Sequence, residues 1–599
     1  MTRAKTSQRS VGSYVLAGAL FGMFLVALTL PVARAQYPLQ YPSSPQVTKD
    51  GTAILIADYA TMPLEDPSIP KPAIIEGQLA RQNFLRAEPA DAPRSSTRFF
   101  VNDMDGTLYL LDKKTKKFTP YLNLAAIFPK LAYDAAYEGG FTFLVFDPEY
   151  AKNGKFYTEH TEDPARPGSP NPTNAGTPGL KLDGYATTPV VKPPVGEPLW
   201  EAVLVEWTDT NINNDTFEGT AREVLRVGFS GVTHQLDDMI FDPDAKPGSP
   251  DYRNLYIGVG DGGAGQRGGA GIDTAQRLDA MQGKIIRITP DINLRPNDKL
   301  SDNGRYRIPS TGPDPNPFVS LANARPEIFI YGVRNPQRLF WDKETNTLIE
   351  DEISQDAWEE VNIIKKGSNY GYPAREGDEL LFVENGISKT GTQKTPAVPF
   401  PEDDKLRVAG LDEPVTPLYP ALVYSHMDGN STGSGYVYRG NRLPQLRGKF
   451  IFTDIVTGRI FYADLSEMLA THGIRNHHAP IHEIQVYYKS SYDNPTNGSP
   501  EGAVNGAQKR RMYDIVADAF QHRGGKAKPG VAMPSSATTV GGWRDGTVTT
   551  KIDPYGVPYG GGRADVRLAM GIDGELYVLS KTDGMIREIV SVVTPPPSK

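Results

Sequence analysis

The sequence contains no cysteine among its 599 residues. Disulfide bonds, thiolate metal sites, haem attachment through a CxxCH motif and a cysteine nucleophile are therefore excluded. An excess of positive charge is also lacking, because 63 Lys and Arg residues stand against 71 Asp and Glu residues, for a net charge of -8. Since this balance offers no basic surface for a polyanion, we expect no nucleic-acid partner.

Long hydrophobic runs are scarce, and the one that stands out covers about residues 15–32. Arg3, Lys5 and Arg9 precede it, and Ala33-Arg34-Ala35 has the small-x-small pattern of a cleavage site. We therefore expect a cleaved signal peptide at residues 1–35, a periplasmic or secreted protein, and no stable membrane span after cleavage. An uncleaved anchor is the alternative, because the run approaches the roughly 18 residues of a spanning helix.

Glycine and proline, in contrast, are plentiful, with 59 and 51 residues spread along the chain. One short pattern recurs between them: a turn residue, an apolar run with an aromatic or β-branched residue, and a polar stop. Its six copies occupy residues 105–112, 153–160, 253–261, 345–352, 447–454 and 573–580. Six regularly recurring hairpins predict an all-β, six-bladed β-propeller. A β-sandwich or several separate β domains would also satisfy alternating strands and polar turns.

The expected organisation is a signal peptide at 1–35, an N-terminal extension and lead-in at 36–95, the propeller at 96–590 and a tail at 591–599. Irregular Pro/Gly-rich stretches at 161–198, 293–317, 374–414 and 490–550 are expected to form long loop insertions on the propeller rims. Short helices are expected near 465–470 and 513–520.

Two motifs are interpreted as structural. Residues 258–263 match GxGxxG, but the glycine-rich sequence after them cannot start the helix that a dinucleotide site needs. Small residues there instead allow a ligand or the central channel to approach the backbone. His477, His478 and His482 lie close together, but no carboxylate at regular spacing completes a metal site, and a solvated loop is expected.

His234 is the candidate general base. It precedes a predicted strand, where propeller loops gather toward the axis, and imidazole accepts a proton near neutral pH. Arg334, Arg439 and Arg459 each stand beside a strand boundary. If they converge, their guanidinium groups suit a planar, multiply anionic ligand. The alternative is that they cap carbonyl groups or pair with surface acids.

Several segments together resemble the soluble quinoprotein glucose dehydrogenase and glucose/sorbosone dehydrogenase family, in family order from about residue 96 to 590. Arg-Asn-Pro-Gln at 334–337 and Asn-Tyr-Gly-Tyr-Pro at 369–373 are specific in combination. The matching pieces are 138–150, 234–261, 283–288, 331–337, 360–373, 436–440, 447–460 and 574–577.

The resemblance implies a propeller that holds pyrroloquinoline quinone (PQQ) with calcium and oxidises the anomeric hydroxyl of an aldose to a lactone. The partners would be a sugar and an electron acceptor that the sequence does not identify, and the oligomeric state is likewise open. The implied catalytic residues are His234 as base, Arg334 and Asp261. The implied cofactor contacts are Glu138, Gln266, Asn335, Arg439 and Arg459, and the backbone of Ser354 and Gln355 is implied for calcium.

The chain departs from the family pattern around these positions. Thr233 replaces the acidic residue before the histidine, and Leu236-Asp237 replaces a Gly-Gly pair, which could crowd the pocket. Ser354-Gln355 stands where calcium-binding backbone is commonly Gly-Pro. The alternative function is a non-catalytic exported propeller that binds glycans or a protein partner. A calcium-dependent hydrolase or lactonase ranks third, because it would need inward carboxylates around one metal.

Overall fold

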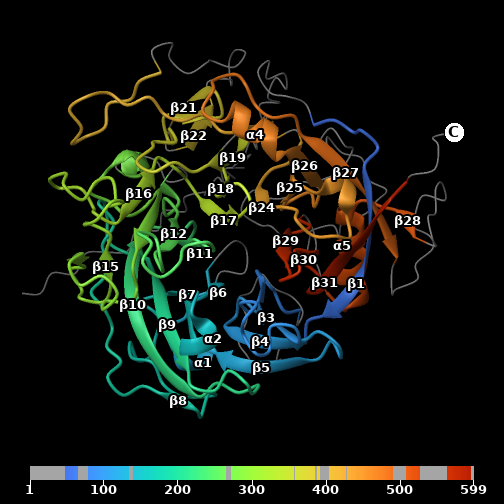
Figure 1. Cartoon of the computed structure of the whole chain (residues 1–599), viewed down its shortest axis with the longest axis horizontal. Helices are drawn as coiled ribbons and strands as arrows, with labels where there is room; N and C mark the ends of the chain where they lie inside the picture. The colour runs from blue at the N-terminus through green and yellow to red at the C-terminus, as the bar shows by residue number, and fades with distance from the viewer. Residues whose placement is uncertain are drawn as a thin grey trace, which may run out of the picture.

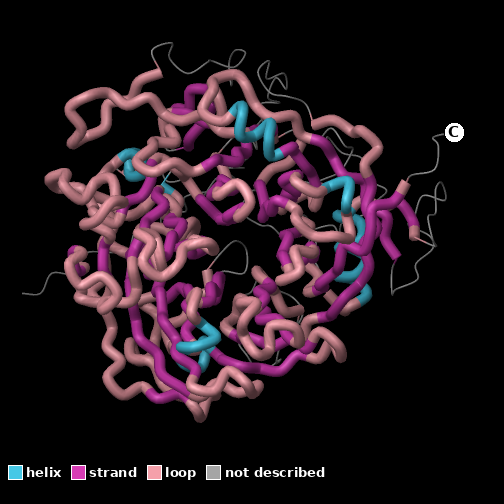
Figure 2. The backbone as a smooth tube through the Cα atoms, in the orientation of Figure 1, coloured by secondary structure: helices cyan, strands magenta, loops and turns pink. Residues whose placement is uncertain are grey.

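The computed structural model describes residues 47–64, 79–133, 139–264, 271–355, 358–384, 387–390, 404–426, 428–489, 507–525 and 563–594. Strands dominate these residues, and the sheets lie around a central axis in a propeller-like arrangement (Figures 1 and 2). The chain therefore has the all-β architecture that its turn-rich composition predicts. The expected signal peptide at 1–35 lies outside the described residues.

Four sheets of four or five strands follow one another along the chain and around the ring. In order of pairing, the first sheet contains β2 (Leu85–Ala87), β3 (Arg98–Asn102), β4 (Thr107–Asp112) and β5 (Phe118–Asn123), and the second contains β6 (Phe141–Phe146), β7 (Lys155–Glu162), β9 (Trp200–Asp209), β10 (Gly219–Phe229) and β8 (Leu180–Lys181). The third sheet contains β11 (Leu236–Phe241), β12 (Leu255–Val259), β13 (Lys284–Ile288) and β16 (Ile328–Tyr331). The fourth contains β17 (Pro336–Asp342), β18 (Thr347–Glu352), β19 (Trp358–Ile363) and β23 (Leu422–Ser425).

A nine-stranded sheet completes the ring. Its strands are β24 (Thr432–Val437), β25 (Lys449–Asp454), β26 (Ile460–Asp464), β27 (His482–Lys489), β1 (Ala53–Thr61), β31 (Met585–Val593), β30 (Leu576–Ser580) and β29 (Val566–Met570), with β28 (Gln508–Lys509) beside β27. All pairings are antiparallel except that of β1 with β27. The N-terminal strand thus joins the last strands of the chain, as Figure 1 shows.

The remaining elements are short. One small sheet consists of two strands, β14 (Lys299–Leu300) and β15 (Arg307–Ile308). Another consists of three, β20 (Arg375–Glu376), β21 (Glu379–Glu384) and β22 (Ile387–Thr390). The helical pieces are α1 (Leu124–Ile127), α2 (Tyr150–Asn153), η1 (Ile272–Gln276), η3 (Pro444–Leu446), α4 (Leu465–Thr471) and α5 (Met512–His522). Helices α4 and α5 lie where short helices were expected.

All six copies of the recurring pattern form strands of antiparallel hairpins, namely β4, β7, β12, β18, β25 and β30. In the first sheet the copy is one strand further out, because β2 takes the inner position. Strands β1 and β2 come from the expected lead-in at 36–95, so the sheets begin before residue 96 and continue to residue 593.

Apolar side chains fill the spaces between neighbouring sheets. One buried cluster joins Phe100 and Leu110 of the first sheet to Phe141 and Trp207 of the second. Face-to-face burial of this kind is the main stabilisation available to a chain without disulfides. The inner strands contact their neighbours around the axis, from β6 through β11, β17, β24 and β29 to β2, and β6 contacts β3 of the first sheet. Their first residues lie at one rim and their last residues at the other.

Candidate active site

His234 and Asp261 form a hydrogen-bonded pair at the start of the third sheet. His234 lies two residues before β11, Asp261 lies two residues after β12, and the distance from Nδ1 to Oδ1 is 2.7 Å. Both side chains are buried. Because an ionised carboxylate only accepts hydrogen bonds, Nδ1 carries a proton and donates to Asp261, which in the neutral tautomer leaves Nε2 as the acceptor. This tautomer is the one that a general base requires.

The Asp261 carboxylate is fixed by several donors. The backbone N–H of Gly263 donates to Oδ1 at 2.8 Å, and the hydroxyl of Tyr372 donates to Oδ2 at 3.0 Å. Burial alone would raise the pKa of Asp261, but the charges and hydrogen bonds of His234 and the charge of Arg334 lower this pKa to about 2. Asp261 is therefore ionised at neutral pH and orients the His234 ring.

Glycines allow this close packing. A Cβ on Gly260 would lie 2.5 Å from the carbonyl oxygen of His234, and one on Gly258 would lie 2.5 Å from that of Pro336. His234 itself has φ of 53°, a left-handed conformation that is uncommon for a side chain of this size. The glycines of the GxGxxG match thus make room for neighbouring backbone, where a ligand or channel was expected.

Arg334 and Asn335 lie immediately before β17 and meet the turn that follows β18. Arg334 donates from Nε to Oε1 of Gln355 and from Nη1 to the carbonyl of Ile353, both at 2.8 Å. Its backbone N–H and that of Asn335 donate to Oε1 of Glu352, at 2.5 and 3.1 Å. The backbone N–H of Asp261 also donates to the carbonyl of Arg334. His234, Asp261, Arg334, Asn335 and Gln355 are therefore brought together.

Nη2 of Arg334 donates no hydrogen bond to the described residues, and its residue is only 4% exposed. A guanidinium N–H in this situation can bind a carboxylate or carbonyl oxygen of a ligand.

Arg439 is not part of this group. It follows the end of β24, and its guanidinium binds Asp342, the last residue of β17, at 2.9 and 2.7 Å. Arg334 precedes the opposite end of β17, about 20 Å away along a seven-residue strand. Glu344 also pairs with Arg439 at 2.8 Å. The expected convergence of Arg439 with His234 is therefore wrong, because the residue lies on the opposite rim.

Arg459 lies in the turn between β25 and β26 and is already bound to acids. Its Nη1 donates to the carbonyl of Asp428 at 2.5 Å, and its Nη2 donates to Glu483 at 2.7 Å. Glu138 and Gln266 lie outside the described residues. Leu236, which could have crowded the pocket, is 2% exposed and packs in the core with Phe229 and Val259.

Sequence reasoning missed a second group of cations around the axis. Arg81, Arg338, Arg567 and Lys581 are each 2–3% exposed. Asp565 is the acid among them: it pairs with Arg81 at 3.0 Å and with Arg567 at 3.1 Å, and Arg563 and Lys581 also act on it. Arg338 is the third residue of inner strand β17, and Arg567 is the second of inner strand β29. A charged residue inside a buried strand was the available signal in the sequence.

We name these buried residues the axial cation cluster (Arg81, Arg338, Arg567 and Lys581), and Asp565 is the one acid that pairs with them among the described residues. Nε of Arg338 and Nε of Arg567 are buried without a hydrogen-bond partner in the described part of the chain. Burial and repulsion by Arg567 lower the pKa of Lys581 far below its usual value, and Asp565 offsets this only in part. Such a group fits a ligand with several carboxylates.

A cavity of about 280 Å³ adjoins Asp261. The loop between β8 and β9 supplies Val195 and Glu197, and the β12–β13 connection supplies Thr274 and Gln282. The lining mixes apolar residues with the polar side chains of Glu197, Ser230, Asp261, Thr274 and Gln282, and none of the lining residues that the structure describes is Lys, Arg or His. A cavity of this size and character can admit a monosaccharide.

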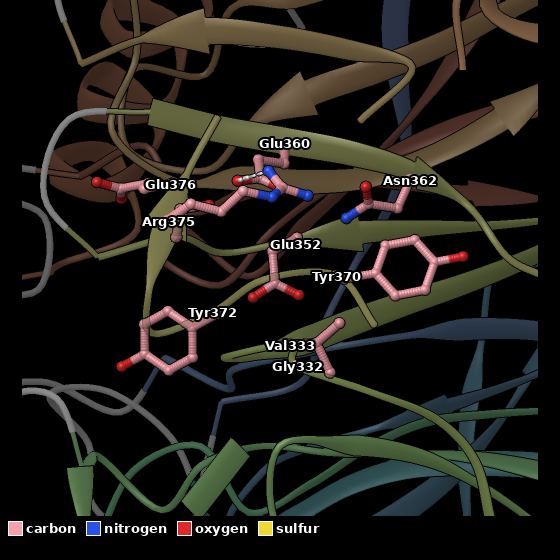
Figure 3. Close-up of a pocket in the computed structure, with 10 residues that line it drawn as sticks. Gly332, Val333, Glu352, Glu360, Asn362, Tyr370, Tyr372, Arg375 and Glu376 are labelled. Atoms are coloured by element: carbon pink, nitrogen blue, oxygen red, sulfur yellow. Dashed lines mark ion pairs between the residues drawn. The ribbon is translucent and has the colours of Figure 1, made fainter. Parts of the chain in front are cut away.

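A second, much smaller cavity lies behind Arg334 and has room for about one water molecule (Figure 3). Glu352, Ser354, Glu360 and Asn362 line it, and Figure 3 shows Glu352 between Tyr370 and Tyr372. Three buried oxygens here have no hydrogen-bond partner in the described part of the chain: Glu352 Oε2, Ser354 Oγ and Asn362 Oδ1. Burial raises the pKa of Glu360, and the charge of Arg375 offsets this only in part.

The oxygen atoms that line this cavity are of the kind that bind a hard cation such as calcium. The expected Ser354 is at the cavity, but Gln355 accepts from Arg334 instead. Among the described ranges, no three His, Cys, Asp or Glu residues are grouped closely enough to hold a metal by themselves. An ion would therefore rely on the hydroxyl and amide oxygens as well as on the carboxylates.

The histidine-rich segment differs from the expected solvated loop. His478 is buried, and its Nε2 lies 2.6 Å from Oδ2 of Asp378 while its Nδ1 lies 3.1 Å from the carbonyl of Pro420. Because both ring nitrogens are hydrogen-bonded within the protein, this histidine has a structural role.

Comparisons with known proteins agree with the motifs. The family model "Glucose / Sorbosone dehydrogenase" matches residues 248–486. The HIPL1 protein of Arabidopsis thaliana is 24% identical over 69% of this chain and 56% of its own length. Aldose sugar dehydrogenase YliI of Escherichia coli is 31% identical over 29% of this chain and 37% of its own length. The Hedgehog-interacting protein of Mus musculus is 24% identical over 61% of this chain and 41% of its own length.

The chain thus spans between about a third and a little over half of these relatives. Among solved structures, a glucose dehydrogenase crystal structure aligns with 85% of this chain and 98% of its own, at 16% identity and a TM-score of 0.45. The PQQ-bound aldose sugar dehydrogenase of Streptomyces coelicolor aligns with 89% and 96%, at 17% identity and a TM-score of 0.43. In the described residues, no helix is both long and apolar enough to cross a membrane. The resemblance found in the motifs is confirmed: residues 248–486 of this chain match the glucose/sorbosone dehydrogenase family model.

Proposed function

We propose that this protein is a PQQ-dependent sugar dehydrogenase that oxidises the anomeric hydroxyl of an aldose to a lactone. The observation that carries the proposal is the His234–Asp261 pair, held beside Arg334 and a cavity with both polar and apolar lining residues. The family match and the aldose sugar dehydrogenase relative support the reaction class.

The fold offered for this function is a six-bladed propeller. The nine-stranded sheet divides at the parallel pairing of β1 with β27 into two antiparallel sets of four. Counted with the four other large sheets, these two sets make six blades, and β1 supplies the outer strand of the last one. Export to the periplasm or beyond remains part of the proposal, on the basis of residues 1–35.

The cofactor would be held by its carboxylates at the axial cation cluster and by its carbonyl oxygens at Arg334 and Asn335. When bound, PQQ supplies a quinone that accepts a hydride from the sugar carbon. His234 Nε2 takes the hydroxyl proton, so that one proton and one hydride leave the same C–OH group. Asp261 holds the ring in the required tautomer and stabilises the imidazolium that forms. The cavity wall orients the sugar hydroxyl groups.

The direct test is reconstitution of the whole protein. Incubated with PQQ, it should change the absorbance spectrum of PQQ and then reduce a redox dye when an aldose is added. Protein without PQQ and protein with PQQ but no sugar are the controls. A flat dye trace across a broad panel of aldoses, together with an unchanged PQQ spectrum, would refute the proposal.

Calcium would occupy the small cavity at Glu352, Ser354, Glu360 and Asn362. Because the unpartnered oxygens there would gain a cation, calcium should raise the melting temperature of the PQQ-free protein by a few degrees. The measurement is thermal unfolding with calcium, with magnesium and with a chelator. Glu360→Gln should abolish the difference between calcium and chelator, whereas a calcium effect that survives in Glu360→Gln would place the ion elsewhere.

The second candidate function is a non-catalytic propeller that binds a protein partner. The long alignments with HIPL1 and with the Hedgehog-interacting protein favour it. Leu236 packs in the core and does not block the pocket, however, and His234 is hydrogen-bonded to Asp261 as a general base would be. We therefore rank the non-catalytic function second. The hydrolase alternative keeps its third place, because cations gather where it requires carboxylates around a metal.

A further inference from the structure

Tyr372 reaches the candidate base from a distant part of the chain. Its hydroxyl donates to Oδ2 of Asp261 at 3.0 Å, while Oδ1 of the same carboxylate serves His234 and the N–H of Gly263. Tyr372 and Asp261 are 111 residues apart in the sequence, and both are buried. The tyrosine therefore fixes the second oxygen of the group that orients His234.

The backbone of Tyr372 is held in place by its own network. Gln276 of η1 donates from Nε2 to the carbonyl of Tyr372 at 2.7 Å, and it exchanges hydrogen bonds with the side-chain amide of Asn369 at 2.9 and 2.7 Å. The N–H of Tyr372 donates to the carbonyl of Gly332 at 2.8 Å. With both backbone groups bound, the hydroxyl has a defined position relative to Asp261.

The hydroxyl acts as a donor throughout the neutral range. Burial and the nearby charge of Asp261 raise the pKa of Tyr372 well above its usual value, so its proton stays on the oxygen. A donated hydrogen bond draws negative charge away from the carboxylate. Asp261 therefore stabilises a protonated His234 less than a free carboxylate would.

We propose that Tyr372 is a positioning residue that sets the basicity and the ring orientation of His234 through Asp261. The inference rests on the proposed role of His234 as the general base. The other charged and titratable groups here are Arg334, which acts on Asp261 and Tyr372, and Glu352, which acts on Tyr372, and both are unchanged in the test variants.

The test compares Tyr372→Phe with Tyr370→Phe. Tyr370 is a matched control, because it is also buried, also lines the small cavity and also donates from its hydroxyl, but to the carbonyl of Ile363. Without the Tyr372 hydroxyl, Asp261 carries more negative charge and stabilises the protonated His234 ring more strongly. The acidic limb of the kcat/KM profile should therefore move up by about 0.5–1 pH unit in Tyr372→Phe. Tyr370→Phe should lower the melting temperature without moving the limb.

A second readout needs no turnover. Nitrogen NMR of ¹⁵N-histidine-labelled, PQQ-free protein, with His234 assigned by its absence in His234→Ala, reports the tautomer and the titration of the ring. An upward shift in Tyr372→Phe but not in Tyr370→Phe supports the inference. Identical titrations in all three proteins overturn it, even if the enzyme is active. If no sugar is oxidised but the shift is present, the proposed function fails and the role of Tyr372 in setting the ring stands.

Discussion

Replacement of His234 by alanine should reduce sugar oxidation by about 10²–10⁴-fold, the usual contribution of a general base. The ring nitrogen that would accept the hydroxyl proton is lost, and Asp261 lies behind the ring, too far back to replace it. PQQ affinity should stay close to that of the wild type, because the axial cation cluster is untouched. Steady-state kinetics with a dye acceptor, together with PQQ titration, measure the two effects separately.

His472→Ala provides the matched control for this variant. His472 is also buried, and both of its ring nitrogens lack a hydrogen-bond partner in the described residues. The His472→Ala variant therefore removes a histidine of similar burial and leaves the candidate site unchanged. It should retain full turnover. If His234→Ala keeps wild-type kcat, or if its loss is explained entirely by weaker PQQ binding, the assignment of His234 as base is wrong.

Replacement of Lys581 by methionine should have two opposite effects. The loss of one charge-assisted contact of about 1.5–3 kcal/mol should weaken PQQ binding by roughly 10–100-fold. The PQQ-free protein should at the same time become more stable, because a buried amine that burial and Arg567 disfavour in its charged form is replaced by an apolar chain of similar length. A rise of about 2–4 °C in melting temperature is expected. PQQ titration and thermal unfolding give the two values.

Arg439→Met distinguishes this effect from a general loss of positive charge. Arg439 lies on the opposite rim and already pairs with Asp342 and Glu344, so its replacement should leave PQQ affinity unchanged and lower the melting temperature slightly. Equal losses of PQQ affinity in Lys581→Met and Arg439→Met would mean that the axial cation cluster is not the cofactor site.

Much of the architecture was predictable from local sequence. A strand needs only a few alternating residues and a turn, so the six hairpins could be predicted from six short patterns, and β12 and β18 lie where their motifs indicated. The association of His234 with Asp261 could also be predicted from the sequence, because each residue flanks one strand of the same hairpin. The inward position of β2 was not, because its three residues carry no distinguishing pattern.

The arginines show where sequence reasoning stopped. Arg334 and Arg439 both stand beside a strand and next to a Gly or Asn, and nothing local separates them. In the structure one precedes an inner strand and the other follows one, and this places them at opposite rims. Arg338 and Arg567 were overlooked because a charged residue inside an apolar strand breaks the hydrophobic pattern of that strand. Only the folded sheet shows which side chains of the strand turn toward the axis.

The sequence by itself determined the class of fold, the absence of thiol chemistry, the family of residues 248–486 and the identity of the candidate base. These properties depend on composition, on periodicity and on short motifs, which are local. Only the tertiary structure decided which charges meet. Arg81 precedes β2, Lys581 follows β30 and Arg338 lies in β17, and Tyr372 reaches Asp261 across 111 residues. Such contacts depend on strand direction, register and ring closure, which no short segment of the chain encodes.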